Sequence, residues 1–202
     1  MMLAFGGASI DGSAYRDVVG LAGRSPGWLD TMIKVWSTYG LAVFALFMAL
    51  AWWRARRLGA GPAVTALAAP VVVVLAYGVN DVLKLLVRED RPCRNLPVRT
   101  LEACPAHGDW SFPSNHAAIA AAAAVALLFV SRWLGTIACA AAVAMAASRV
   151  WIGVHYPHDV ATGMVVGACV PLVAMAAVRG RSEVLAGRLA AAAPLRVLLS
   201  AS

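Results

Sequence analysis

Long runs of apolar residues alternate with short polar segments along most of the chain. The apolar runs are Trp36–Trp53, Pro62–Val87, Ala117–Trp133, Leu134–Trp151 and Val160–Val178. Each run approaches the roughly 20 residues that an α-helix needs to cross the hydrocarbon of a bilayer. Only a short junction around Arg132 separates the third and fourth runs, so we expect them to form a helical hairpin. The pattern predicts an all-α, polytopic transmembrane helix bundle with five spans, or six if one terminal segment inserts.

The two ends of the chain are more polar than the segment between them. Residues 1–35 carry several charged side chains, which predicts an interfacial amphipathic segment ahead of a membrane bundle at 36–178. Residues 179–202 mix leucine and alanine with several arginines, which predicts a basic cytoplasmic or interfacial tail. At this length the chain is expected to form a single integral-membrane domain, 1–202.

Composition supports a membrane protein. Hydrophobic residues make up 61% of the chain and charged residues only 13%, against roughly 25% charged residues in a typical soluble domain. The formal net charge of +7 could indicate a nucleic-acid partner. The arginines are dispersed between apolar runs, however, and do not gather on one helix or loop. We therefore expect no nucleic acid as a partner, and we attribute the charge to anionic lipids and to membrane orientation.

The distribution of arginine predicts how the protein is oriented. The segment Arg54–Arg57 joins the first two spans, and Arg179 and Arg181 follow the last span on the same side. The positive-inside rule assigns this side to the cytoplasm. The polar clusters described next then face the extracytoplasmic side of the cell membrane. Cations between residues 88 and 99 lie on that outer side, and we explain them by function.

The first polar cluster contains Lys84, Arg91 and Pro92 and follows the second run. A phosphoryl group needs more than one cation, and an arginine fork can bind two of its oxygens at once. Pro92 stops a helix and would fix the direction of the arginine before it. Asp81, three residues before Lys84, is expected to pair with it. Membrane-edge anchoring by snorkelling cations explains this cluster equally well when it is taken alone.

The second cluster is the segment Pro113-Ser114-Asn115-His116, directly before an alanine-rich run. Ser114 is a natural N-cap for the expected helix, and the first backbone amides near Asn115 would point at an anion. His116 would stand beside that anion, where it could donate a proton to a leaving oxygen. The plainer alternative is a capped helix with a histidine at the water interface.

The third cluster links the last two runs and contains Ser148, Arg149, His155 and Asp159. A histidine nucleophile needs a neutral ring with one nitrogen free and the other held by an acceptor. Asp159, four residues after His155, could be that acceptor. Arg149 would add a third cation for the same phosphate. His158 is interpreted as an interfacial residue, and Asp159 could alternatively serve only as a partner of the helix dipole.

Taken together, the three clusters form one ordered signature. The pattern Lys84-x6-Arg91-Pro92, Pro113-Ser114-x-His116 and Ser148-Arg149-x5-His155-x3-Asp159 resembles that of the type 2 phosphatidic acid phosphatase superfamily. Within this superfamily, Ser111-Phe112-Pro113 and the segment 151–157 look most similar to bacitracin-resistance-type undecaprenyl pyrophosphate phosphatases. Asn115 departs from the superfamily pattern, which often has glycine there.

The resemblance implies a two-step displacement at phosphorus that uses no metal and no other cofactor. By motif position, His155 would attack phosphorus and form a phosphohistidine held by Asp159. His116 would protonate the leaving group and then help to activate water. The phosphate-binding residues would be Lys84, Arg91, Ser114, Asn115 and Arg149.

The implied substrate is a phosphorylated membrane lipid. Undecaprenyl or another polyprenyl pyrophosphate, hydrolysed to the monophosphate, is the leading candidate. Phosphatidate, phosphatidylglycerol phosphate and a prenyl-phosphosugar phosphate are alternatives. A catalytically silent lipid-binding scaffold is an alternative of another class, which the complete set of motif residues disfavours. A vanadium-dependent peroxidase would share the anion pocket, but the apolar spans argue against it.

Two cysteines, Cys93 and Cys104, flank the polar segment between the second and third runs. On an extracytoplasmic side they could form a disulfide, and two free thiols fit the sequence equally well. Cys139 and Cys169 lie inside apolar runs and are expected to be small packing residues.

Overall fold

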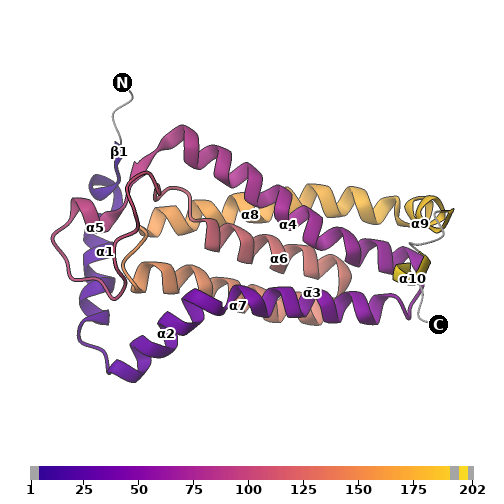
Figure 1. Cartoon of the computed structure of the whole chain (residues 1–202), viewed down its shortest axis with the longest axis horizontal. Coiled ribbons are helices and arrows are strands. Elements are labelled where there is room, and N and C mark those ends of the chain that lie inside the picture. Colours follow the sequence, from indigo (N-terminus) through magenta and orange to yellow (C-terminus); the bar gives the residue numbers. More distant parts are fainter. Residues whose placement is uncertain (1–4, 192–195, 200–202) are drawn as a thin grey trace.

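The computed structural model describes residues 5–191 and 196–199, which form one elongated bundle of helices (Figure 1). In chain order the elements are β1 (Phe5–Gly6), α1 (Ala8–Ala22), α2 (Gly27–Tyr39), α3 (Leu41–Ala55), α4 (Ala60–Val87), β2 (Glu89–Asp90), α5 (Pro92–Asn95), α6 (Asn115–Val130), α7 (Arg132–Trp151), α8 (Pro157–Gly180), α9 (Ser182–Ala191) and α10 (Arg196–Leu199). The two strands have two residues each and pair in parallel. Apart from this contact the described fold is all-α, as the sequence predicted.

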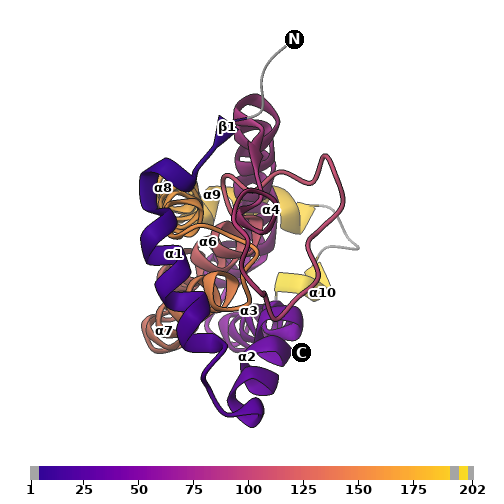
Figure 2. The same cartoon turned by 90° about the vertical axis from the view of Figure 1, so that its left-hand side faces the viewer.

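Helix α6 lies at the centre of the bundle, packed against α4, α7 and α8 (Figures 1 and 2). Its alanines are all buried, and α6 and α7 form the expected helical hairpin. Glycines of α8 allow a very close approach to α6. A Cβ on Gly163 would lie 2.5 Å from the carbonyl oxygen of Ser114, and one on Gly167 would lie 2.2 Å from that of Ala118. This packing places the start of α6 against the start of α8, where two of the three motifs lie.

Helices α4, α7 and α8 are long and apolar enough to cross a membrane. Helices α2 and α3 meet the same criterion only as a pair, bent by 53°. Helix α6 is apolar but has only 16 residues, fewer than the roughly 20 that a perpendicular span needs. By length and composition the chain is therefore a multi-pass membrane protein, and the expected total of five spans stays a prediction.

The amino-terminal region differs from the boundaries expected from the sequence. Helix α2 is continuous from residue 27 to residue 39 and so crosses the expected boundary at residue 35. The bend into α3 lies at Gly40, where a Cβ would come within 2.5 Å of the Trp36 carbonyl oxygen and 2.7 Å of the Met145 side chain. Helix α1 runs across one end of the bundle, over α7 and α8 (Figure 2). It therefore covers that end of the bundle.

The two ends of the bundle carry different chemistry. Segments 88–114 and 152–156, which contain motif residues, meet at the end that α1 covers (Figure 1). At the opposite end, the Arg56 guanidinium lies 4.1 Å from the centroid of the Trp53 ring. The arginines used to predict orientation thus lie far from the motif residues along the bundle axis.

The carboxy-terminal region packs on the arginine-rich end. Helix α9 and Leu199 of α10 contact the start of α4 in a small apolar cluster. The indole of Trp52 donates a 3.0 Å hydrogen bond to the carbonyl of Leu198. Part of the predicted tail, residues 192–195 and 200–202, lies outside the described residues.

Candidate active site

A polar cavity of about 390 Å³ lies at the end of the bundle that α1 covers. It is lined by Lys84, Arg91, Glu102, Ala103, Pro105, Asp109, Asn115, His116, Arg149 and His155. These residues come from all three sequence motifs, so the fold brings the separate clusters together. The two remaining predicted residues, Ser114 and Asp159, are fully buried next to the lining.

His155 lies in the turn between α7 and α8, where Gly153 adopts a φ of +89°. Tyr15 of α1 fixes this turn by donating a 2.8 Å hydrogen bond to the Gly153 carbonyl. The His155 ring has Nδ1 at 3.3 Å from Asp159 Oδ2, and Nε2 at 3.0 Å from Arg91 Nη1. Because a carboxylate accepts the hydrogen of Nδ1, the lone pair belongs to Nε2, on the side of Arg91.

The surroundings of His155 favour its neutral form. Burial, and then the positive charges of Arg91 and Arg149, hold the pKa of His155 well below its usual value. The ring is therefore uncharged at neutral pH. A neutral imidazole with one nitrogen held by an acid is the state that can act as a nucleophile.

Asp159 is held in place by several donors. Its Oδ2 accepts a 2.8 Å hydrogen bond from the Tyr156 amide and a short one from the hydroxyl of Ser111. The Ser111 amide in turn donates to the carbonyl of Glu89 at 2.7 Å. Ser111 thus links the segment before α6 to the start of α8. The expected contact between Asp159 and His155 is present, and the contribution of Ser111 was not predicted.

Lys84 is buried at the pocket end of α4, where its ammonium donates a 3.0 Å hydrogen bond to the Trp110 carbonyl. The predicted pairing of Lys84 with Asp81 is wrong, because the two are not within ion-pair distance in the described part of the chain. Asp81 instead lies 3.5 Å from the side-chain nitrogen of Asn115. The ammonium of Lys84 therefore binds the Trp110 carbonyl, in a distant loop, and not the local carboxylate of Asp81.

The two predicted arginines are anchored differently. Arg91 forms a 2.8 Å ion pair with Asp109 and donates to the Val154 carbonyl at 2.9 Å. Arg149 donates from Nη1 to the hydroxyl of Ser37 on α2 at 2.8 Å. Its Nε is buried and has no hydrogen-bond partner among the described residues. Arg149 therefore keeps donor capacity for an anion in the pocket.

The second motif begins α6 as predicted, with Ser114 at the N-cap position. The Ser114 side chain, however, makes no capping hydrogen bond, and its hydroxyl is buried without a partner among the described residues. Asn115 accepts a 2.7 Å hydrogen bond from the side chain of Asn80 on α4. The unused hydroxyl of Ser114 and the first amides of α6 can serve an anion.

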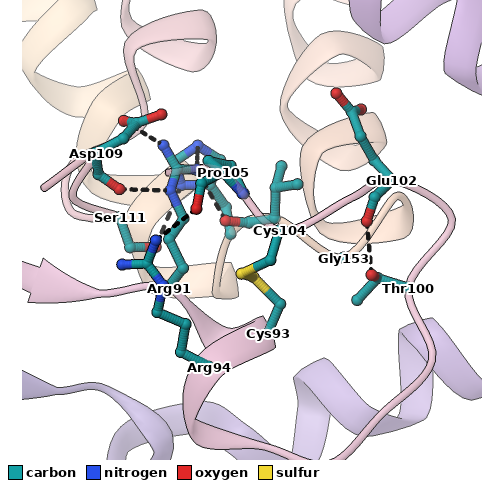
Figure 3. The surroundings of a disulfide bond; sticks show 12 residues. Arg91, Cys93, Arg94, Thr100, Glu102, Cys104, Pro105, Asp109, Ser111 and Gly153 are labelled. Carbon is teal, nitrogen blue, oxygen red and sulfur yellow. Dashed lines mark hydrogen bonds and ion pairs between the residues drawn. A yellow bond between two sulfur atoms is a disulfide. The ribbon is translucent and has the colours of Figure 1, made fainter. Parts of the chain in front are cut away.

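A polar strap, defined as residues 96–110, forms the other wall of the pocket (Figure 3). The Cys93–Cys104 disulfide ties it to α5. The amide of Glu102 donates to the Ile152 carbonyl at 3.3 Å, beside the His155 turn. Oε2 of Glu102 is buried with no hydrogen-bond partner among the described residues. The strap thus brings an unpaired carboxylate oxygen into a pocket rich in cations.

His158 has ion-pair partners that were not predicted from the sequence. Its Nδ1 lies 2.8 Å from Asp11 of α1, and its Nε2 lies 3.0 Å from Glu89 of β2. Only 16% of its side chain is exposed. These partners could not be predicted because both are distant in sequence and are brought to His158 by the folding of α1 and β2 over this end of the bundle.

Several residues of the site were not predicted from sequence, namely Ser37, Asn80, Glu102, Asp109 and Ser111. Ser111 had a usable signal, because it stands in the Ser-Phe-Pro segment that contributed to the family resemblance. Asn80 also had a signal, because it is a polar residue inside an apolar run, one turn before Lys84. Ser37, Glu102 and Asp109 had none, since each reaches the site through contacts between segments far apart in the chain.

Comparison with known proteins identifies the family. The model of the PAP2 superfamily matches residues 62–183. The undecaprenyl-diphosphatase BcrC of Bacillus subtilis is 32% identical over 144 residues, which are 68% of this chain and 69% of that protein. An undecaprenyl-diphosphatase of Sulfolobus acidocaldarius is 35% identical over 97 residues, which are 47% of this chain and 46% of that protein. A decaprenylphosphoryl-5-phosphoribose phosphatase of Mycobacterium tuberculosis is 36% identical over 97 residues, which are 48% of this chain and 51% of that protein.

Solved structures support the same fold. The crystal structure of LpxE from Aquifex aeolicus superposes with a TM-score of 0.63 at 22% identity, covering 81% of this chain and 93% of that one. At this identity the likeness concerns the fold alone. The family model, however, spans more than half of this chain and includes every motif residue of the pocket. The chain therefore belongs to the PAP2 superfamily, the type 2 phosphatidic acid phosphatases that its three motifs resemble.

Proposed function

We propose that this protein is a membrane lipid phosphatase that converts undecaprenyl or another polyprenyl pyrophosphate to the monophosphate through a phosphohistidine, without a metal. One observation carries the proposal. Nε2 of His155 lies beside Arg91 in the cationic pocket, while Nδ1 faces the buried Asp159. Two relatives named undecaprenyl-diphosphatase support the choice of lipid.

In the first step, the lone pair of His155 Nε2 attacks the terminal phosphorus, and the bond from phosphorus to the bridging oxygen breaks. His116 donates a proton to the departing oxygen, so that the lipid monophosphate leaves and phosphohistidine remains. The hydrogen bond from Nδ1 to Asp159 stabilises the positive charge that develops on the ring. The bound phosphate, by its own negative charge, favours the protonated form of His116 that this step requires.

In the second step, a water molecule attacks the phosphorus of the phosphohistidine, and the N–P bond breaks. His116, now neutral, accepts the proton of that water, which releases inorganic phosphate and returns His155 to its starting form. Charge accumulates on the phosphoryl oxygens in both steps. Groups that would bind these oxygens are Lys84, Arg91, Arg149, Asn115 and the unpaired hydroxyl of Ser114, and such preorganised donors supply the largest electrostatic contribution.

We place the pocket on the extracytoplasmic side of the cell membrane. The arginines of the opposite end favour a cytoplasmic location for that end under the positive-inside rule. The Cys93–Cys104 disulfide lies at the pocket end, and disulfides persist in oxidising compartments. Labelling of single cysteines placed in the strap with a membrane-impermeant thiol reagent on intact cells tests this placement.

Release of phosphate by the purified protein in detergent, with excess chelator, tests the function. The panel of substrates holds undecaprenyl pyrophosphate, phosphatidate, phosphatidylglycerol phosphate and a prenyl-phosphoribose phosphate. His155→Ala should lower turnover by about 10⁴-fold or more, as expected when a nucleophile is removed. His107→Ala, a change of an exposed histidine in the strap, is the matched control and should leave turnover unchanged.

Three outcomes would overturn this proposal. Comparable hydrolysis by the His155→Ala protein would exclude this residue as the nucleophile. The absence of release from every lipid by the wild-type protein would favour the alternative of a catalytically silent, lipid-binding scaffold. Loss of activity in chelator, restored by one added divalent metal, would contradict the metal-free mechanism.

A second candidate substrate is a prenyl-phosphosugar phosphate, which one observation favours. The unpaired Oε2 of Glu102 is a strong hydrogen-bond acceptor in the pocket. A sugar hydroxyl could donate to it, whereas the second phosphate of a pyrophosphate would only be repelled by it. A relative in Mycobacterium tuberculosis is named for a decaprenylphosphoryl phosphoribose substrate.

The change Glu102→Gln separates the two substrates. If a sugar hydroxyl binds this carboxylate, kcat/KM for the prenyl-phosphoribose phosphate should fall by about tenfold, the worth of one hydrogen bond to a charged group. The same change should raise kcat/KM for undecaprenyl pyrophosphate, because one repulsive charge is removed. A decrease for both lipids would instead assign Glu102 a role in holding the strap.

A further inference from the structure

His158 joins three parts of the chain behind the catalytic pair. It follows the His155 turn on α8, and its ring lies between Asp11 of α1 and Glu89 of β2. Nδ1 lies 2.8 Å from Asp11, and Nε2 lies 3.0 and 3.1 Å from the two oxygens of Glu89. The same Nε2 is 3.4 Å from Oδ1 of Asp159, the oxygen that faces away from His155. The mechanism proposed above gives His158 no role.

The surroundings of His158 contain more negative charge than a buried region tolerates without a cation. Glu89 is 1% exposed and Asp159 is fully buried. A buried carboxylate without a cationic partner strongly destabilises a fold. Among the described residues, His158 is the one cationic side chain within ion-pair distance of both carboxylates. The positive charge of a protonated His158 therefore compensates the negative charges of Glu89 and Asp159.

The geometry of the ring also identifies its protonation state. Both ring nitrogens face carboxylate oxygens at hydrogen-bond distance. A neutral imidazole has one donor and one lone pair, so one nitrogen would face an acceptor with its own lone pair. An imidazolium has two donors and satisfies both carboxylates.

Nε2 of His158 and oxygens of Glu89 and Asp159, all within 4.8 Å of one another, could alternatively hold a metal ion, which the experiment below includes as an outcome.

Other parts of the chain pack closely against the network. A Cβ on Gly7 would lie 1.9 Å from Glu89 Oε1 and 2.6 Å from the His158 ring, so the chain before α1 lies directly against it. The His158 ring stacks on Tyr156, with centroids 5.4 Å apart and planes 16° from parallel. The ring of Phe112 lies 5.9 Å away. His158 therefore has a single, well-defined orientation.

We propose that His158 is a positioning residue whose imidazolium bridges Asp11 and Glu89, balances the buried charge of Asp159, and so fixes the carboxylate that orients His155. The proposal rests on the proposed function, because it concerns how that nucleophile is held. Asp159 has one oxygen, Oδ2, committed to Ser111, the Tyr156 amide and His155. Without a positive charge beside Oδ1, the carboxylate would be repelled by Glu89 and could turn away from His155.

The experiment is a double-mutant cycle with the changes His158→Gln and Glu89→Gln in the full chain. The matched control is His107→Gln, at an exposed histidine that is not among the residues lining the pocket. His158→Gln should lower kcat by roughly tenfold to hundredfold, the usual cost of a small displacement of a reacting group, and change KM by less than about twofold. In the double variant, Glu89 no longer carries an unbalanced charge, so most of the lost kcat should return. Thermal unfolding in detergent should show the same coupling, with the double variant less destabilised than the sum of the single variants.

The readouts separate the possible failures. Unchanged kcat in a folded His158→Gln protein would overturn the positioning role. Additive losses of thermal stability would overturn the ion network, and this measurement does not depend on turnover. A divalent metal that is bound stoichiometrically by the wild-type protein and lost in His158→Gln would replace charge balance by a metal site. If the wild-type protein hydrolyses no lipid phosphate, the positioning role falls with the proposed function, while the thermal cycle still decides whether the ion network exists.

Discussion

The two walls of the pocket are built in opposite ways. One wall consists of side chains from long helices, with Lys84 on α4, His116 on α6 and Arg149 on α7, and it is cationic. The other wall is the strap, which brings the carboxylates of Glu102 and Asp109 and is tied down by a disulfide. The helix wall presents what every phosphate ester needs, namely positive charge and donors. The strap presents what distinguishes one ester from another, so we assign general phosphate binding to the first wall and selectivity to the second.

Among the changes that compare the two walls, removing a cation from the helix wall should lower kcat/KM the most. Arg149→Gln is expected to lower kcat/KM by about 10²- to 10³-fold, the usual loss when one donor to a developing negative charge is removed. Because the phosphoryl group is common to all candidates, the loss should be similar for every lipid that the wild-type protein hydrolyses. Arg132→Gln, a change of an exposed arginine at the opposite end of the bundle, is the matched control. A loss confined to one lipid would contradict the division between the walls.

Ser37 offers a milder test of the same wall. Its hydroxyl accepts the 2.8 Å hydrogen bond from Arg149 and is buried on α2. Ser37→Ala should lower kcat/KM by about 10- to 100-fold, since a hydrogen bond to a charged group contributes about 1.5–3 kcal/mol. Thr38→Ala changes the neighbouring hydroxyl, which is exposed and bonds within its own helix, and should have no effect. Equal losses in both variants would point to a general weakening of α2.

Removing the disulfide of the strap should change activity less than Arg149→Gln does, and it should act on KM and not on kcat. In Cys93→Ser/Cys104→Ser the strap loses its covalent tie and must be ordered when substrate binds. Ordering costs about 0.5–1.5 kcal/mol per side chain, so KM should rise by about 2- to 10-fold with kcat nearly unchanged. Thermal unfolding should also occur at lower temperature, because a disulfide stabilises a domain by roughly 2–4 kcal/mol. Cys169→Ser, at a free and exposed cysteine, is the control. A large fall in kcat would show that the strap also orders the helix wall.

The sequence predicted the two walls unequally, and the reason is physical. The helix wall follows from local signals, since apolar runs set α4, α7 and α8, and the motif residues stand near the ends of these helices. The strap contains no apolar run or repeat that predicts its path. Its contact between Glu102 and the turn at Ile152 joins segments that only the assembled bundle brings together.

The contacts behind His155 could not be predicted either, because they also join segments that only the assembled bundle brings together. The bond from Arg149 to Ser37 spans 112 residues, and that from His158 to Glu89 spans 69. The expected pair of Asp81 with Lys84 shows the converse error, in which a favourable local spacing is overridden by a tertiary partner, the Trp110 carbonyl. Sequence spacing therefore identified the motif residues that line the pocket and the contact of His155 with Asp159, but not the partners that come from distant segments.

The pH dependence of turnover gives the finest comparison of the two walls. Burial and the charges of Arg91 and Arg149 hold the pKa of His155 below its usual value. A lowered pKa means that the ring stays neutral, and nucleophilic, below the ordinary histidine value of about 6.5. The acid limb of kcat/KM that reports His155 in the free protein should therefore lie below about pH 6.5.

Changes in the two walls should shift the acid limb of the pH profile by different amounts. Arg149→Gln removes a nearby positive charge, so the pKa of His155 should rise and the acid limb should shift to higher pH by less than about one unit. Cutting the disulfide leaves both guanidinium groups beside His155 and should not move the limb. Ionisation of the lipid phosphate contributes equally in every variant, so it cancels when the profiles are compared on one substrate. An equal shift in the disulfide variant would show that the strap, and not the helix wall alone, controls the charge state of the nucleophile.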